Sequence, residues 1–334
     1  MRTPEHDART VGSDRALHDA LSLVEQELEA VRARIGEQLR TPHESVNALL
    51  RQVAASGGKM LRPALALLSA RCFGPVRPAH IDLAAVVEMI HTASLLHDDV
   101  IDEARRRRGR ETMNALHGNE IAVLLGDFLL SRVFALGVGI ENAEVARSLA
   151  ETAVRLCRGE LLQNTQRDNA GIDEATYLNI VRDKTAELFA TCCHLGAVVA
   201  EADHMSCQAL REYGMNLGTA FQITDDLLDV LGDPQRVGKT LGTDLAKRKF
   251  TLPLIHHMQA LPGEAREELV ERLCGPDAAE RLPELLARTD SIAYARARAS
   301  DYARDAMDAL DVIAPGPARR SLKAVADYVR TRAS

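Results

Sequence analysis

Apolar residues recur along the chain at the three- and four-residue spacing of an α-helix. Leu83, Val86, Val87 and Ile90 follow one another in this way, and the same spacing returns across residues 178–188. Such spacing gathers apolar side chains on one face of a helix. The sequence contains no run of alternating β-branched residues between Asn-Gly or Asp-Gly turns. The pattern therefore predicts an all-α protein.

Proline positions indicate where helices can run. After Pro78 the next proline is Pro234, and a proline inside a helix costs about 3 kcal/mol. This interval predicts a helical core, with turns expected at residues 74–78, 171–173 and 232–234. Residues 1–14 are expected to be a loosely attached tail. The Ala-, Arg- and Glu-rich chain after Pro262 is expected to add a peripheral layer to a single domain, residues 15–334.

The segment Ile121–Ile140 is apolar and about as long as a membrane span. Asp127 and Arg132 lie in its middle, where each charge would be costly in a bilayer. We therefore expect a helix buried on most sides in a bundle. The polar N-terminus has no apolar core of the kind found in signal peptides, so a cytoplasmic protein without a transmembrane segment is predicted.

Composition excludes other classes of protein. Hydrophobic residues make up 46% and charged residues 27% of the chain, which is typical of a globular protein with a large core. A net charge of −7 argues against a nucleic-acid binder. The six cysteines lack CxxC spacing, so we expect reduced, buried thiols and neither a disulfide scaffold nor a zinc site.

Two segments, LLHDDVID (95–102) and QITDDLLD (222–229), each place the pattern Asp-Asp-x-x-Asp inside an apolar helical stretch. On a helix, Asp98 and Asp102 share one face, as do Asp225 and Asp229. Clustered carboxylates repel one another and need neutralisation. Mg²⁺ does this well, because it takes one or two carboxylates and fills its octahedron with water and phosphate oxygens.

A single such motif could be a solvated helix face, but two, both preceded by apolar residues, favour a metal site. A di-iron bundle would need Glu-x-x-His pairs on facing helices, and none accompanies these aspartates. His97 is expected to be a packing or supporting residue. The motifs therefore predict magnesium as the cofactor.

Cationic segments supply candidate phosphate ligands. Gly57-Gly58 precedes Lys59, and Arg62 follows three residues later, so that two cations can bind one anion beside a flexible backbone. A run of arginines, Arg105–Arg108, directly follows the first aspartate motif. Beside a magnesium site in an acidic protein, these arginines favour diphosphate binding over a solvated face or a nucleic-acid patch.

These segments together resemble the trans-polyprenyl diphosphate synthases, the chain-elongating isoprenyl transferases. GGKMLRP, LLHDDVIDEARRRRG, DDLLD and GKTLGTDLAKRKFTLP occur here in that family's order, and the similarity runs from about Val46 to about Arg332. The resemblance implies antiparallel helices around a deep cavity, usually in a homodimer. It implies condensation of isopentenyl diphosphate with an allylic diphosphate.

The resemblance also implies roles for individual residues. The isopentenyl diphosphate site would contain Lys59, Arg62, His91 and Arg108. The magnesium ligands would be Asp98, Asp102, Asp225 and, with them, Asp229. The other cations of the allylic diphosphate site would be Arg107, Lys184, Lys239 and Lys249. Thr185 and Gln222 would lie near the reacting carbons. This chain has Arg248 where the family usually has glycine, which leaves the conformation of that loop and the reach of Lys249 open.

The region before the first motif bears on product length. Farnesyl synthases of bacteria and many geranylgeranyl synthases carry a two-residue insertion in this motif or an aromatic residue just upstream. Here the motif has no insertion, and Ala93 and Ser94 precede Asp98 by five and four positions. We expect Ala93, about 7.5 Å below Asp98, on the tunnel-facing side, with Ile90 and Met89 as deeper walls. Small residues leave a tunnel open, so a product of about C30 or longer is predicted, as for quinone side chains.

Sequence features separate this function from three alternatives. Geranylgeranyl diphosphate synthase is the nearest, separated only by the open-tunnel argument. A class I terpene cyclase would lack the GGK segment and the second Asp-Asp-x-x-Asp motif, and both are present. A non-catalytic subunit of a heteromeric synthase would be expected to have lost aspartates or arginines, and none is missing.

Overall fold

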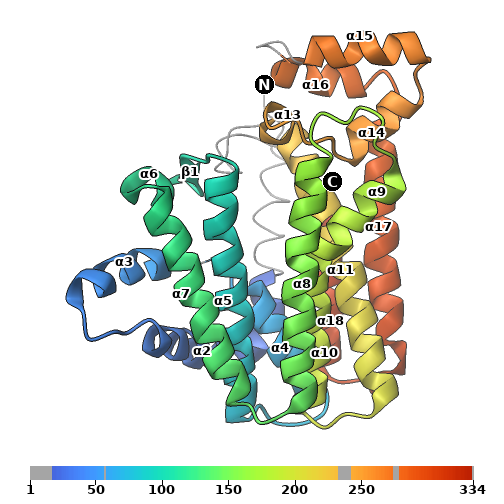
Figure 1. Ribbon diagram of the computed structural model, residues 1–334. Coiled ribbons are helices and arrows are strands. Elements are labelled where there is room, and N and C mark those ends of the chain that lie inside the picture. The colour runs from blue at the N-terminus through green and yellow to red at the C-terminus, as the bar shows by residue number, and fades with distance from the viewer. Residues whose placement is uncertain (1–16, 56–57, 232–241, 274–277, 333–334) are drawn as a thin grey trace.

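Long helices that run side by side form the body of the protein (Figure 1). The computed structural model describes residues 17–55, 58–231, 242–273 and 278–332. The first half contains η1 (Ser22–Val24), α2 (Glu25–Gln38), α3 (Glu44–Ala55), α4 (Leu61–Arg71), α5 (Pro78–Ile101), β1 (Arg106–Arg107), β2 (Arg110–Glu111), α6 (Met113–His117), α7 (Asn119–Val138) and α8 (Ala143–Thr165). Apart from the short hairpin of β1 and β2, the described residues form an all-α fold, as the hydrophobic spacing predicts.

The second half continues the bundle and adds a group of short helices at one end (Figure 1). It contains α9 (Glu174–Val181), the π-helical turn η2 (Arg182–Ala186), α10 (Glu187–Val199), α11 (His204–Leu231), α13 (Thr243–Ala246), α14 (Leu252–Gln259), α15 (Gly263–Leu273), α16 (Ala278–Leu286), α17 (Ser291–Ala309), η3 (Leu310–Val312) and α18 (Pro317–Thr331). The turns expected at 74–78 and 171–173 are confirmed, whereas residues 232–234 lie outside the described residues.

Helix starts follow local sequence signals. Pro78 occupies the first turn of α5, where its missing N–H is not needed. The Asn142 side chain accepts hydrogen bonds from backbone N–H groups at the start of α8, and Asp173 does the same for α9. Such caps satisfy N–H groups that have no partner within the helix.

The largest hydrophobic cluster is formed by helices from both halves of the chain. Leu67 of α4, Val86 of α5, Leu217 of α11 and Val325 of α18 all belong to it. α10 runs through the middle and is buried along most of its length. A second cluster, with Leu227 of α11, joins α9, α14, α16 and α17. The helices after Pro262 thus pack on the same bundle as the rest.

α10 and α11 approach each other closely because glycine faces the contact. A Cβ atom on Gly214 would lie 2.5 Å from the Phe189 carbonyl oxygen, and one on Gly218 would lie 2.6 Å from the Ala186 Cα atom. No larger residue fits at these distances without moving the backbone. The contact brings η2, at the start of α10, against the middle of α11.

The pattern did not predict the hairpin of β1 and β2, which pairs Arg107 with Arg110. Its two-residue turn, Arg108-Gly109, has positive φ at both positions, 50° and 77°, as in the tight hairpin turns that favour glycine. The turn reverses the chain directly after α5, so that Arg107 lies beside the first aspartate motif and contacts Asp99.

α7 differs from the sequence expectation. Its residues Leu125 and Leu129 are buried in a cluster with α5, but Leu124, Phe134 and Val138 are 61%, 62% and 72% exposed. α5 and α7 are both long and apolar enough to cross a membrane by length and composition, with 61% and 39% of the apolar window buried. The expectation of a helix buried on most sides is wrong for α7 within this chain. Composition cannot tell whether an apolar face is covered by the same chain.

Most of the described cysteines are free thiols away from solvent, as the sequence predicts. Cys192, Cys193 and Cys207 are buried as free thiols, and Cys72 is half-buried. Cys157 is exposed on α8, which corrects the prediction of burial. Cys274 lies outside the described residues.

Candidate active site

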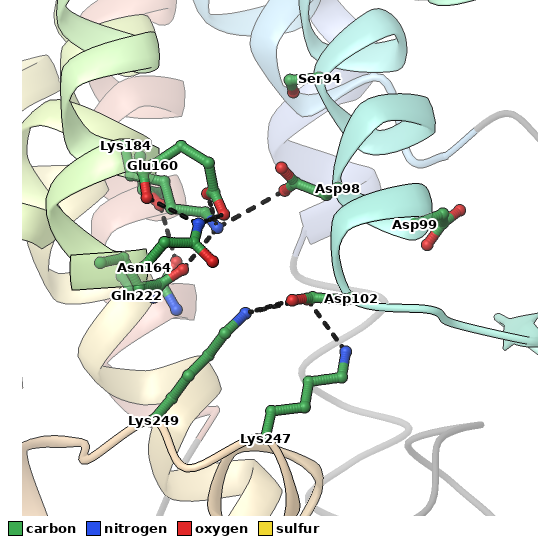
Figure 2. A network of polar contacts seen from close by, with 12 residues as sticks. Ser94, Asp98, Asp99, Asp102, Glu160, Asn164, Lys184, Gln222, Lys247 and Lys249 are labelled. Carbon is green, nitrogen blue, oxygen red and sulfur yellow. Dashed lines mark hydrogen bonds and ion pairs between the residues drawn. The ribbon is translucent and has the colours of Figure 1, made fainter. Parts of the chain in front are cut away.

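Both aspartate motifs lie near the C-terminal ends of long helices, α5 and α11, at the same end of the bundle (Figure 1). Figure 2 shows Asp98 and Asp102 on the face of α5 that looks toward α8 and η2. Asp99 points away, and its carboxylate accepts a hydrogen bond of 2.9 Å from Arg107 Nε. The four-residue spacing therefore turns the carboxylates of Asp98 and Asp102 inward, whereas the carboxylate of Asp99 binds Arg107 of the hairpin.

Asp102 is surrounded by three cations from two distant parts of the chain. Its carboxylate lies 2.8 Å from Lys249 Nζ, 3.0 Å from Lys247 Nζ and 2.6 Å from an Arg167 guanidinium nitrogen. Burial alone would raise the pKa of Asp102, but the two lysines outweigh it and hold the pKa at about 2. Lys249 thus reaches the site although Arg248 replaces the usual glycine.

Arg248 takes the backbone conformation that glycine would favour. Its φ is 55°, in the left-handed region, and its side chain pairs with Asp168, whose own φ is 64°. The Asp168 N–H also donates to the Arg248 carbonyl oxygen at 3.3 Å. The loop before Lys249 is therefore held against the loop after α8.

Asp98 faces a lysine held by a second acid. Lys184 Nζ lies 3.6 Å from Asp98, donates to Gln163 Oε1 at 2.7 Å and pairs with Glu160. Burial raises the pKa of Asp98, and burial alone would lower that of Lys184, but Asp98 and Glu160 hold the lysine pKa above its usual value. Lys184 therefore stays cationic between two carboxylates.

The π-helical turn that carries Lys184 and Thr185 is fitted closely to α8. A Cβ atom on Gly159 would lie 2.5 Å from the Lys184 backbone nitrogen, so α8 can approach this turn only with glycine there. π-Helical turns are rare and are found often at functional sites.

The second motif contacts Arg332, just after α18, and the first turn of α13. Arg332 donates to Asp225 at 3.0 Å, with its guanidinium 5.1 Å from the Phe221 ring centre. Asp229 accepts from the Asp244 backbone N–H at 3.1 Å. Asp225 and Asp229 both line the cavity.

The middle aspartate of the second motif is buried. Asp226 accepts hydrogen bonds from Tyr177 Oη at 2.6 Å and from Gln222 Nε2 at 2.7 Å. Burial, followed by the charge of Asp244, raises its pKa well above the usual value. Gln222 in turn accepts from Thr185 Oγ1 at 2.8 Å. Thr185 and Gln222, predicted to lie near the reacting carbons, thus touch each other.

A second group of cations gathers around the start of α4. A Cβ atom on Gly58 would lie 2.7 Å from Arg108 Nη1, which places the GGK segment against the hairpin. Arg62 is stacked 4.6 Å from the Phe189 ring centre, and its buried Nε atom has no hydrogen-bond partner in the described structure. Lys59 Nζ lies 3.4 Å from Tyr328 Oη.

Electrostatics in this group favour an anion. Burial, assisted by Arg108, lowers the pKa of Arg62, and Glu88 opposes the shift. Burial, assisted by Arg62 and Arg108, holds the pKa of His91 well below its usual value. His91 is therefore a neutral imidazole beside the guanidinium groups of Arg62 and Arg108. A bound phosphate would relieve the repulsion between these two guanidinium groups.

A cavity of about 660 Å³ lies between the two motifs. Its walls include the predicted site residues Asp102, Arg107, Lys184, Thr185, Gln222, Asp225, Asp229 and Lys249. Phe250 and Ile180 add apolar surface. Lys239 lies outside the described residues. Six residues of the site were not predicted: Arg167, Lys247, Glu160, Asp226, Tyr177 and Arg332. Two of them carried a signal, because Asp226 belongs to the second aspartate motif and Lys247 to the basic LAKRK run.

The four residues predicted to set chain length do not line this cavity. Ser94 is partly exposed and lies on the same face of α5 as Asp98 (Figure 2). Ala93 is fully buried in a cluster with α3 and α7, about 140° around the helix from Asp98. Met89 and Ile90 are buried in the main core. Ala93 is thus placed differently from the expectation, and its effect on product length stays a prediction.

The donor set fits magnesium carried by a diphosphate better than a metal held by protein alone. Among the described residues, no three His, Cys, Asp or Glu side chains lie close enough to hold a metal ion. Asp98 and Asp102 on α5 and Asp225 and Asp229 on α11 instead form two pairs, and of these four Asp102, Asp225 and Asp229 line the cavity. Mg²⁺ commonly uses one or two carboxylates and takes its other ligands from phosphates and water.

Comparison with known proteins agrees with this geometry. Residues 43–287 match the family model described as polyprenyl synthetase. The chain is 37% identical to octaprenyl diphosphate synthase of Escherichia coli over 303 residues, which are 90% of this chain and 94% of the relative. It is also similar to the structure of a decaprenyl diphosphate synthase from Rhodobacter capsulatus, with a TM-score of 0.89, 38% identity and coverage of 95% and 99% of the two chains.

A third comparison concerns ligands. The structure of a polyprenyl synthase from Caulobacter crescentus, complexed with calcium and isoprenyl diphosphate, matches with a TM-score of 0.90, 35% identity and coverage of 95% and 98%. Fold and site therefore define a prenyltransferase of the isoprenoid synthase fold. The chain belongs to the polyprenyl synthetase family.

Proposed function

We propose that this protein is a magnesium-dependent trans-polyprenyl diphosphate synthase that adds isopentenyl diphosphate repeatedly to an allylic diphosphate. The observation that carries the proposal is that both aspartate motifs line one cavity. Lys184, Lys247 and Lys249 line the same cavity. These groups suit a substrate that brings several negative charges and shares its oxygens with metal ions. A terpene cyclase would not need the second cationic group around Arg62.

The first step is loss of diphosphate from the allylic substrate. The carbon–oxygen bond breaks, and its electron pair leaves with the diphosphate, so that an allylic cation remains. Lys249, Lys247 and Arg167, now paired with Asp102, are placed to bind the departing oxygens. Preorganised cations of this kind stabilise charge as it develops. Bound magnesium would supply further Lewis-acid neutralisation of the same diphosphate.

The second step joins two carbons. Arg62, Arg108 and Lys59 would bind the diphosphate of isopentenyl diphosphate, with neutral His91 beside them. The π electrons of its double bond form the new carbon–carbon bond to the allylic cation. Loss of a proton from the adjacent carbon restores an allylic double bond, and the departing diphosphate accepts that proton. Apolar walls such as Phe250 exclude water that would trap the cation.

Several features support a long product. The relatives reported above are named octaprenyl and decaprenyl diphosphate synthase, and the face of α5 below Asp98 carries the small residue Ser94. A product of about C30 or longer is therefore favoured over geranylgeranyl diphosphate. Such a product would serve as a precursor of quinone side chains.

The exposed apolar face of α7 and α8 supports a homodimer. Leu124, Phe134 and Val138 on α7, with Val154 and Leu161 on α8, are each more than 60% exposed. An apolar patch of this kind usually marks a protein interface. The proposed protein is thus a homodimer of single catalytic domains, residues 15–334, and it works in the cytoplasm, where its charged substrates would be dissolved.

The proposal predicts a strict metal requirement. Turnover of isopentenyl diphosphate and farnesyl diphosphate should stop in excess chelator and return with Mg²⁺, as followed by chromatography of the products. Asp98→Ala and Asp225→Ala should each lower turnover about 100-fold or more, because stabilisation of the leaving group is lost. Asp327→Ala, which changes an exposed aspartate paired with Arg330, is the matched control. Full activity in chelator would overturn the proposal.

A further inference from the structure

Four side chains on the cavity wall form one continuous hydrogen-bond chain. Tyr177 Oη lies 2.6 Å from Asp226 Oδ2, Gln222 Nε2 lies 2.7 Å from Asp226 Oδ1, and Thr185 Oγ1 lies 2.8 Å from Gln222 Oε1. Tyr177, Asp226 and Thr185 are each less than 10% exposed. Water therefore has little access to replace any of these partners.

The direction of this hydrogen-bond chain, from donor to acceptor, is set at Asp226. Its Oδ1 atom accepts from Gln222 Nε2, both when Asp226 is ionised and when Oδ2 carries a proton toward Tyr177. The amide of Gln222 has one donor end and one acceptor end. With the donor end on Asp226, the acceptor end must face Thr185. The Thr185 hydroxyl hydrogen is then used toward Gln222, and the oxygen lone pairs are left for the cavity.

This direction matters for a positive charge. In the proposed reaction a cation forms in a cavity that has Thr185 and Gln222 on its wall. Oxygen lone pairs aimed at that cation lower its energy, whereas a hydroxyl hydrogen aimed at it would raise it. If the Gln222 amide were reversed, its NH₂ group would donate to Thr185 and turn the hydroxyl hydrogen toward the cavity.

We propose that Asp226, held by Tyr177, is a positioning residue that orients the Gln222 amide and thereby directs the Thr185 oxygen lone pairs at the allylic cation. The inference rests on the proposed function. Both Asp226 oxygens are engaged by Tyr177 and Gln222, so this aspartate has a different task from its neighbour Asp225. This positioning role requires the hydrogen-bond acceptor at Asp226 Oδ1, and it does not require the charge of the carboxylate.

The test compares a variant that keeps this acceptor with one that removes it. Asp226→Asn retains an amide oxygen for Gln222 and presents its NH₂ group to the Tyr177 oxygen, so kcat should stay within about threefold of wild type. Asp226→Leu has a similar volume but no acceptor, and kcat should fall about 10- to 100-fold. The KM for the allylic diphosphate, and the calorimetric Kd of a non-reactive allylic thiolodiphosphate with Mg²⁺, should stay nearly unchanged in both.

A double-mutant cycle separates positioning from general stability. Thr185→Val removes the hydroxyl and keeps the shape, so Asp226→Leu should lower kcat little further in that background. Independent effects would instead multiply. Tyr177→Phe should lower kcat slightly, and Tyr294→Phe, which removes a tyrosine–carboxylate hydrogen bond of 2.5 Å outside the cavity, should not change it. If Asp226→Leu fails to fold, Asp226→Ala replaces it, with an expected loss of about tenfold.

The outcomes distinguish this inference from the proposed function. A wild-type protein that does not elongate allylic diphosphates would overturn the proposed function itself. With an active wild type, the positioning role is contradicted by an unchanged kcat in Asp226→Leu, by multiplicative effects with Thr185→Val, or by a large loss in Asp226→Asn. Loss of analogue binding in parallel with kcat would point instead to damage of the diphosphate site.

Discussion

The charged residues of the site neutralise one another in the structure. Asp102 is paired with Lys247, Lys249 and Arg167, and Asp98 faces Lys184. A diphosphate with magnesium can bind by exchanging partners. The diphosphate oxygens would replace the carboxylates as partners of the lysines and arginine, and the carboxylates would bind the metal ion. In the first motif, the four-residue spacing was sufficient to predict that Asp98 and Asp102 face inward. It could not predict their partners, because Arg167 and Lys247 lie 65 and 145 positions away.

The cation group around Arg62 leads to a prediction for substrate affinity. Arg108→Ala and Lys59→Ala should each raise the KM for isopentenyl diphosphate about 10- to 100-fold, since each removes a charge-assisted contact of about 1.5–3 kcal/mol. The KM for the allylic diphosphate should change much less. Arg110→Ala is the control, because Arg110 lies just after the same run, beyond Gly109, but donates to the Ala55 carbonyl oxygen. A selective rise in the allylic KM would show that the two diphosphate sites are exchanged.

Arg248 provides a prediction for stability. A non-glycine residue in the left-handed region costs about 1–2 kcal/mol, and φ at Arg248 is 55°. Its ion pair with Asp168 is exposed, and exposed pairs contribute about 0–1 kcal/mol. Arg248→Gly should therefore raise the free energy of unfolding by up to about 1 kcal/mol, with turnover retained because Lys249 keeps its backbone path. Arg248→Ala, which keeps the strain and loses the pair, should not be stabilised; chemical denaturation of both variants measures the difference.

At the scale of elements, contacts between helices decide where the reacting groups lie. Gly214 and Gly218 allow α11 to approach α10, and Gly159 allows α8 to approach the π-helical turn. These contacts bring Thr185 and Gln222 within 2.8 Å. The helical pattern across 178–188 was visible in the sequence, but the π-helical turn within it was not. An extra residue per turn leaves almost no trace in hydrophobic spacing over one turn.

The face of α5 below Asp98 leads to a prediction of product length. Ser94→Phe places a ring on the face that carries Asp98, and products should shift from about C30 or longer toward about C15–C20, because a growing chain cannot displace a packed ring cheaply. Ala93→Phe should shorten products less and lower the melting temperature more, since Ala93 is fully buried against α3 and α7. Ser94→Thr, which adds only one methyl group on the same face, is the control.

Product chromatography with one primer decides the matter. A wild type that stops at about C20 would contradict the long-chain proposal. Unchanged lengths in Ser94→Phe would show that this face of α5 does not limit elongation. A larger shift in Ala93→Phe than in Ser94→Phe would restore Ala93 as the residue that sets chain length.

At the scale of the whole molecule, parts of the chain that are distant in sequence complete one site. α5 and α11 both end at the same end of the bundle (Figure 1), and Arg332, just beyond α18, reaches Asp225 of α11. The short helices near α13 lie at the same end, and the segment between α13 and α14 supplies Lys247 and Lys249. The site is therefore a product of the complete bundle.

The exposed face of α7 and α8 gives a prediction for assembly. Phe134→Asp combined with Val138→Asp should convert a dimer to a monomer, because charges replace side chains that are 62% and 72% exposed in the single chain and would be desolvated at an interface. Light scattering after size exclusion measures the mass. Met205→Asp, on α11 and 67% exposed, should leave the dimer intact. A monomeric wild type would remove the basis for this interface.

The sequence by itself determined the helical fold, the two aspartate motifs, the GGK and arginine segments, and the family. These depend on short-range spacing, which a helix converts directly into faces. Tertiary structure alone decided that Asp102 is paired with three cations, that Arg332 lies on Asp225, that Ala93 faces α7, and that Asp226 connects Tyr177 to Gln222. Apart from the Gln222–Asp226 hydrogen bond within α11, these contacts join segments that are far apart in the sequence. They depend on how the helices and loops are packed together, and local spacing carries no information about that packing.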